Sequence, residues 1–167
     1  MKVDHDTIEI RHKGLFDLNS IYRGMRKWLR DREYDYDEKR YKDKVGHLGN
    51  DLDLEMLGEL RVTEFVKFNV EIVCKFSNLK EFEAELGGEV RKVSNGQFFV
   101  QISGSVTFDY QERFSSPVAQ SFLKFLVGTL LKNYYDVKYV DRFYYDLYDL
   151  QTLIKELSFM ETASNAF

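Results

Sequence analysis

The polar residues best suited to bind another molecule lie on one face of a segment near the N-terminus. Their helical spacing places four cations side by side: Arg23, Arg26, Lys27 and Arg30. Clustered cations bind phosphates, and Trp28 together with nearby tyrosines could stack on bases. This face predicts contact with nucleic acid, with an acidic protein surface or with an anionic membrane surface. The alternative is a solvated helix face whose cations pair with neighbouring acids: Asp31, Glu33, Asp35 and Asp37.

Two sets of alternating acids are a second candidate for chemistry. Alternate side chains of a strand share one face about 6.6 Å apart, a spacing that suits a metal ion or an acid–base pair. The two sets are Asp51, Asp53 and Glu55, and Glu81, Glu83 and Glu85. Acids that alternate with apolar residues are equally typical of a strand with one face in water. A metal-dependent enzyme with carboxylate ligands therefore ranks third among the functions, and no metal ligand or catalytic residue is assigned.

Other reactive side chains are few and form no known motif. The three histidines, His5, His12 and His47, have no metal-ligand spacing and are expected on the surface or in loops. Cys74 lies on the apolar face of its predicted strand, which predicts a buried thiol. The sequence has neither a glycine-rich phosphate loop nor a nucleophile elbow. It thus predicts no cofactor.

Two long segments, 66–76 and 98–110, alternate apolar with mostly polar residues and predict the centre of a sheet. Four of their side chains are expected to be nearly fully buried: Val70, Ile72, Val100 and Ile102. Gly104 leaves a gap in the second apolar face, which predicts a large side chain packed over the backbone there.

Shorter strands are expected at 7–12, where Gly14 ends the strand, at 33–45 and at 51–56. A turn is predicted at Ser77–Asn78. A type I′ hairpin is predicted at Asn95–Gly96, because both residues accept a positive φ.

Three helices are predicted. The first is the basic amphipathic helix at 18–32, and the second begins at Pro117 behind a serine cap. This second helix is apolar on two faces, which predicts burial on both sides. The third carries a heptad seam, spaced by three and four residues: Val140, Phe143, Leu147, Leu150, Ile154 and Leu157.

The seam has two interpretations. It can pack inside the chain, or it can contact a second subunit through Phe143, Leu147, Leu150 and Ile154. The second helix has more apolar faces than one sheet can cover, which favours the second interpretation. Tyrosines beside the seam are expected to point outward, and interfaces favour tyrosine: Tyr139, Tyr144, Tyr145 and Tyr148.

Strands followed by helices predict an α+β fold. It comprises a twisted antiparallel sheet of five to seven strands, covered by the N-terminal basic helix and a C-terminal pair of helices. We expect a single domain over 1–167, with a strand-rich part at 1–116, the helical pair at 117–159 and a frayed tail at 160–167. The 167 residues, 44% of them hydrophobic, suffice for a substantial core.

Composition also limits the function. A net charge of −4 and a start without an apolar leader favour a cytoplasmic protein without a transmembrane segment. The first-ranked function is a small intracellular, non-enzymatic assembly or adaptor protein that self-associates through its surfaces. The alternative is a nucleic-acid-binding protein that uses the helix at 18–32. The expected partner is thus a second copy, with an acidic protein surface or nucleic acid as alternatives.

Overall fold

The computed structural model describes residues 1–86 and 88–158, so the predicted tail at 160–167 lies outside the described residues. Within this part of the chain, six strands form one antiparallel sheet: β1 (Lys2–Asp4), β2 (Ile8–Phe16), β3 (Asp35–Val45), β4 (Asn50–Arg61), β5 (Val66–Leu86) and β6 (Glu89–Phe108). β1 and β2 both pair with β6, and the order continues through β5 and β4 to β3. The α+β class and the antiparallel sheet are confirmed.

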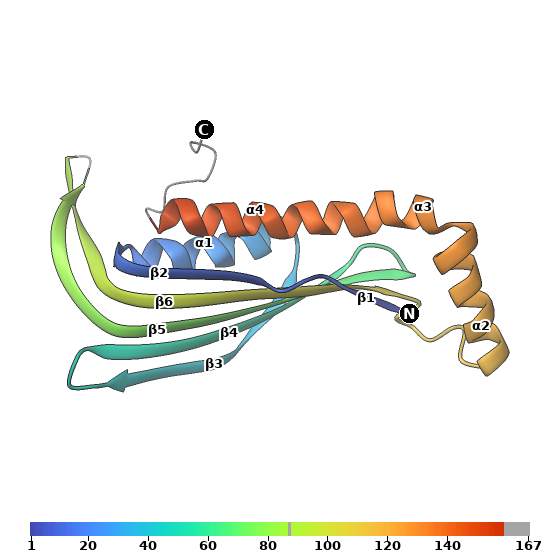
Figure 1. Cartoon of the computed structure of the whole chain (residues 1–167), viewed down its shortest axis with the longest axis horizontal. Coiled ribbons are helices and arrows are strands. Elements are labelled where there is room, and N and C mark those ends of the chain that lie inside the picture. Colours follow the sequence, from blue (N-terminus) through green and yellow to red (C-terminus); the bar gives the residue numbers. More distant parts are fainter. Residues whose placement is uncertain (87, 159–167) are drawn as a thin grey trace.

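Helical segments follow the strands in two places. The N-terminal helix is α1 (Leu18–Asp31), as predicted. The C-terminal segments are α2 (Pro117–Phe125), η1 (Leu126–Leu130), α3 (Lys132–Tyr135), η2 (Asp136–Val140) and α4 (Asp141–Leu157), in which η1 and η2 are π-helical turns. Figure 1 shows α1 and α4 on the same face of the curved sheet, whereas α2 lies beyond the end of the strands.

The core forms between this face of the sheet and the two helices. The four strand residues predicted to be buried are at most 2% exposed. On the helices, the buried residues are Ile21, Met25, Trp28 and Leu29 of α1 and the seam residues of α4. Gly24 of α1 lies against Leu153 and Leu157 of α4, so the missing side chain lets the two helices approach closely.

Gly104 has the role that its position in the apolar face predicts. A Cβ atom placed there would lie 2.5 Å from Cζ of Phe143 and 3.0 Å from Cδ1 of Leu147. Both side chains of α4 are fully buried, and the Phe143 ring lies 4.8 Å from the ring of Phe68. The glycine therefore fixes where α4 crosses the sheet.

The predicted turn at Ser77–Asn78 and the predicted hairpin at Asn95–Gly96 are wrong. β5 continues through 77–78 with a bulge, and β6 continues through Asn95 and Gly96. Gly96 is needed for a different reason, because a Cβ there would lie 2.8 Å from the carbonyl oxygen of Ser77. Asn78 takes the positive φ, 56°, within the bulged part of β5. Figure 1 shows both strands bending together, and their pairing continues to Leu86 and Glu89.

The strand at 7–12 also runs further than predicted. Gly14 does not end β2, because its φ of +130° is accommodated within the strand opposite Gly96. The close pairing of two glycines on β2 and β6 therefore continues the sheet into its bend.

Candidate interaction surface

The C-terminal arm, which we define as residues 117–131, is the part of the molecule best placed to contact another one. Ser116 caps α2 by accepting a hydrogen bond from the backbone N–H of Ala119, and Pro117 takes the first helical position. η1 prolongs the helix to Leu130, and Leu131 interrupts it with φ −110° and ψ 15°. The arm thus forms a helix of its own past the end of the sheet (Figure 1).

The prediction that this helix is buried on both sides is wrong. Leu123 and Val127, which belong to one apolar stripe of the helix, are buried. The other stripe is largely in solvent. Its exposed fractions are 81% for Val118, 54% for Phe122, 55% for Phe125 and 64% for Leu130. The helical spacing of apolar residues did not indicate which stripe would be covered. In the structure α1 and α4 already cover the sheet, so this stripe finds no place on it.

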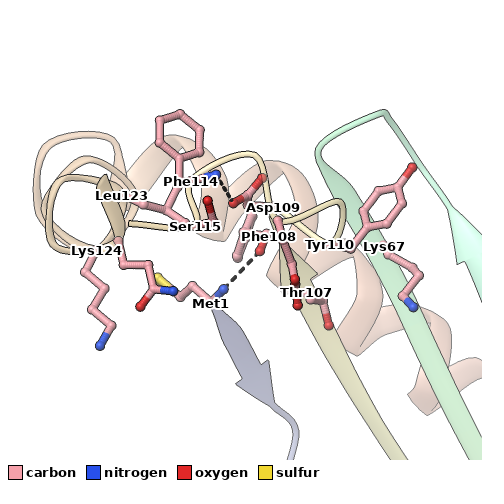
Figure 2. A pocket seen from close by; sticks show the side chains of 12 residues that line it. Met1, Lys67, Thr107, Phe108, Asp109, Tyr110, Phe114, Ser115, Leu123 and Lys124 are labelled. Carbon is pink, nitrogen blue, oxygen red and sulfur yellow. Dashed lines mark hydrogen bonds between the residues drawn. The ribbon is translucent and has the colours of Figure 1, made fainter. Parts of the chain in front are cut away.

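A short, well-bonded loop attaches the arm to the end of β6. Asp109 is buried with φ +55°, and its carboxylate accepts hydrogen bonds of 2.9 Å from the backbone N–H groups of Arg113 and Phe114. Figure 2 draws the bond from Phe114 together with the bond of 3.0 Å that the Met1 ammonium donates to the Phe108 carbonyl. Asp109 is therefore a structural anchor of the loop.

A hollow of about 450 Å³ separates the arm from the end of the sheet. Its charged lining includes Lys124 of the arm and Lys67 of β5, which lie on opposite sides of the group drawn in Figure 2. Lys67 pairs with Glu59 at 2.6 Å, and the Asp109 carboxylate bonds to backbone amides. Because the Lys67 ammonium and the Asp109 carboxylate already have partners, we assign both groups a structural role rather than a role in acid–base chemistry.

The four cations predicted as a phosphate site lie on α1, but two of them have partners in the chain. Arg26 donates to the Tyr36 hydroxyl at 3.1 Å, which raises the pKa of Arg26, and it lies 3.7 Å from the Glu38 carboxylate. Lys27 pairs with Asp31 at 2.6 Å. Arg23 and Arg30 are exposed. Lys27 thus pairs with one of the acids expected for a solvated helix face, Asp31, whereas Arg26 pairs with Glu38, which was not among them.

The four seam residues proposed for self-association all lie in the interior of the chain. Each is fully buried, and α4 packs them against the sheet and α1: Phe143, Leu147, Leu150 and Ile154. A contact between copies would therefore have to use other residues. Of the tyrosines beside the seam, Tyr145 and Tyr148 are exposed, whereas Tyr139 is buried and Tyr144 is partly buried.

The remaining reactive residues are distributed over the molecule. His5 is buried, against the expectation of a surface histidine, because its ring packs edge-on against Tyr144 at 4.2 Å. Burial raises the pKa of Cys74 to about 12, so the thiol is held protonated. Among the residues that the structure describes, no group of three or more His, Cys, Asp or Glu side chains is arranged to hold a metal ion.

Comparison with known proteins adds no functional clue. No protein-family model and no curated protein matches this sequence. Within the described part of the chain, none of the helices combines the length and the apolar character that crossing a bilayer requires.

Proposed function

We propose that this chain is a non-enzymatic assembly protein of the cytoplasm that forms a dimer through its C-terminal arm. The observation that carries the proposal is the apolar stripe that the arm leaves in solvent, headed by Val118, Phe122 and Phe125. Apolar patches beyond a few hundred Å² are uncommon on monomers and usually mark binding sites.

The exposed area suits a second copy of the chain. Seven large apolar side chains are exposed here, five on the arm and two just beyond it in α3 and η2: Val118, Phe122, Phe125, Leu130 and Leu131, and Tyr134 and Val137. At roughly half exposure, each contributes on the order of 100 Å². Together they offer about 700 Å², close to the roughly 800 Å² that each partner buries in a standard interface.

The charge and the shape of the arm also favour a protein interface. Lys124 is the only charged residue between 117 and 131, and interface centres are depleted of charge. Gly128 has open space where a Cβ would lie, so a neighbouring helix can approach the backbone there. A two-fold dimer, in which the same patch meets itself, is the commonest way to bury such a surface.

Light scattering after size exclusion, at protein concentrations from about 1 to 100 µM, tests this proposal. The wild-type chain is expected to elute as a dimer. Phe122→Ser with Phe125→Ser is expected to elute as a monomer with an unchanged circular dichroism spectrum, because both rings are half exposed in one chain. A matched control, Phe82→Ser with Val90→Ser, removes exposed apolar area far along β5 and β6 and should leave the dimer intact. A wild-type monomer at the highest concentration would contradict the proposal.

A further inference from the structure

A second surface lies on the outer face of the sheet, which we define as the face opposite α1 and α4. Two adjoining hollows of about 630 and 300 Å³ share Lys13 and Gln97 in their linings. They lie where β2, β6 and β5 run side by side toward the bend. This surface is separate from the arm and from the cations of α1.

A row of cation, aromatic ring and cation crosses the larger hollow. In the register of the sheet, Phe99 of β6 lies directly between Arg11 of β2 and Lys75 of β5. Both neighbours of Phe99 and of Lys75 are buried, as is Ile10 beside Arg11, so the three side chains share the outer face. The Arg11 guanidinium lies 5.1 Å from the centre of the Phe99 ring. An aromatic ring thus lies in the solvent-facing surface with a positive charge on each side.

Further donors surround this row. Lys13 is one row along β2, opposite Gln97, and the smaller hollow adds Lys80 together with the amides of Asn78 and Asn95. Three acids border the group: Glu9, which pairs with Arg11 at 3.5 Å between exposed side chains, Asp53, opposite Lys75 on β4, and Asp51, which accepts a hydrogen bond of 2.9 Å from the backbone N–H of Asn78. Four cations against three bordering acids leave the surface slightly positive in a chain whose net charge is −4.

We propose that this surface binds single-stranded nucleic acid. Proteins that bind single strands without sequence preference combine cations that follow the backbone with aromatic rings on which bases stack. Arg11, Lys13, Lys75 and Lys80 supply the first element, and Phe99 supplies the second. A base-paired duplex keeps its bases stacked on one another, so the Phe99 ring favours a single strand. The amides of Gln97 and Asn95 can donate to base edges or phosphates on the same surface.

Fluorescence anisotropy with labelled oligonucleotides of about 16 nucleotides tests this proposal. Oligo-dT and oligo-rU are titrated with the full chain at about 50 mM salt and again at about 200 mM salt. Four phosphate contacts predict a slope of about −3 for log K against log salt. Phe99→Ala should weaken binding roughly 5- to 150-fold, the range measured for loss of one stacked base. Phe99→Leu, which keeps an apolar side chain, should also weaken it and guards against a folding defect.

Two further variants locate the site. Lys75→Gln should weaken binding and make the salt slope less steep by about 0.7, the amount expected for one lost contact. Arg23→Gln with Arg30→Gln removes two exposed cations of α1 and should leave binding unchanged. The proposal is overturned if neither oligonucleotide binds at up to about 100 µM protein in low salt. It is also overturned if the α1 variant abolishes binding while Phe99→Ala does not, or if polyglutamate competes as well as the oligonucleotide does.

Discussion

Replacing Gly104 by alanine tests how α4 lies on the sheet. The added Cβ would lie 2.5 Å and 2.8 Å from Cζ and Cε1 of Phe143, and 3.0 Å from Cδ1 of Leu147. Both side chains are fully buried, so neither can turn into solvent. Overpacking of this kind costs about 1–3 kcal/mol. Alanine restricts the unfolded chain and returns about 0.4–1 kcal/mol. Taking the middle of each range, about 2 and about 0.7 kcal/mol, we expect Gly104→Ala to lower the free energy of unfolding by about 1.3 kcal/mol.

Urea denaturation followed by circular dichroism measures this loss, and a double-mutant cycle assigns it to the ring. Phe143→Leu alone leaves a cavity and destabilises the chain. In the Phe143→Leu background the ring atoms are gone, so Gly104→Ala should cost less than it does in the wild type, with a coupling of about 1 kcal/mol. Ser103→Ala, at the adjacent outward-facing position, serves as the control and should change stability by less than about 0.5 kcal/mol.

An additive cycle, or a Gly104→Ala variant as stable as the wild type, would refute this account of the core. Such a result would mean that Phe143 does not pack over Gly104 within one chain. The seam would then again be available for a contact between subunits.

Two other predictions concern buried polar groups. Burial raises the pKa of Cys74 to about 12 from an ordinary value of 9.0, so its protonated form stabilises the fold below pH 9 and that contribution is lost as the pH rises toward 12; the urea midpoint of the wild type should fall more steeply over pH 9–11 than that of Cys74→Ala, and equal slopes would contradict the burial. Asp109→Ala should cost about 1–3 kcal/mol, because two backbone N–H groups in the loop before the arm lose their acceptor; thermal unfolding measures this cost, and a change within about 0.5 kcal/mol would show that the carboxylate does not hold the loop.

Alternation of apolar and polar residues was sufficient to predict the centre of the sheet. In β5 and β6, every predicted core position is buried, because a register that placed these residues outward would expose a whole apolar face. The gap at Gly104 even indicated the close contact that Phe143 makes. Local pattern succeeds here because one face of each strand is covered along most of its length.

Residue types that favour turns led to wrong predictions in β5 and β6, which are 21 and 20 residues long. Asn95–Gly96 is a strong hairpin signal, yet both residues stay in β6. There β5 bulges beside Gly96 and resumes its pairing at Asn95, opposite Lys80, while β2 pairs with both residues. Glycine at 96 is required by the backbone of Ser77, and a positive φ is taken by Asn78 instead. The same residue types serve a turn or a bend, and only the pairing of distant strands decides between them.

The spacing of apolar residues could not predict which helix covers the sheet, because two helices compete for the same face. Both the second and the third helix carry apolar stripes able to cover the sheet. α4 takes that position, because Phe143 and Leu147 fit over Gly104, and α2 is left with Phe122 and Phe125 in solvent. Exposed apolar surface was thus predicted correctly in kind, but most of it lies on the arm, and beside the seam Tyr145 and Tyr148 are exposed as well.

The measurement that tests the arm as a dimer interface most directly is disulfide cross-linking between two copies. Ser121 is an exposed arm residue beside the stripe, and Thr152 is an exposed residue of α4 away from it. In a Cys74→Ala background, Ser121→Cys should form a covalent dimer on mild oxidation, whereas Thr152→Cys should stay monomeric on a denaturing gel. Equal cross-linking of the two variants, or none with Ser121→Cys, would contradict a dimer formed through the arm.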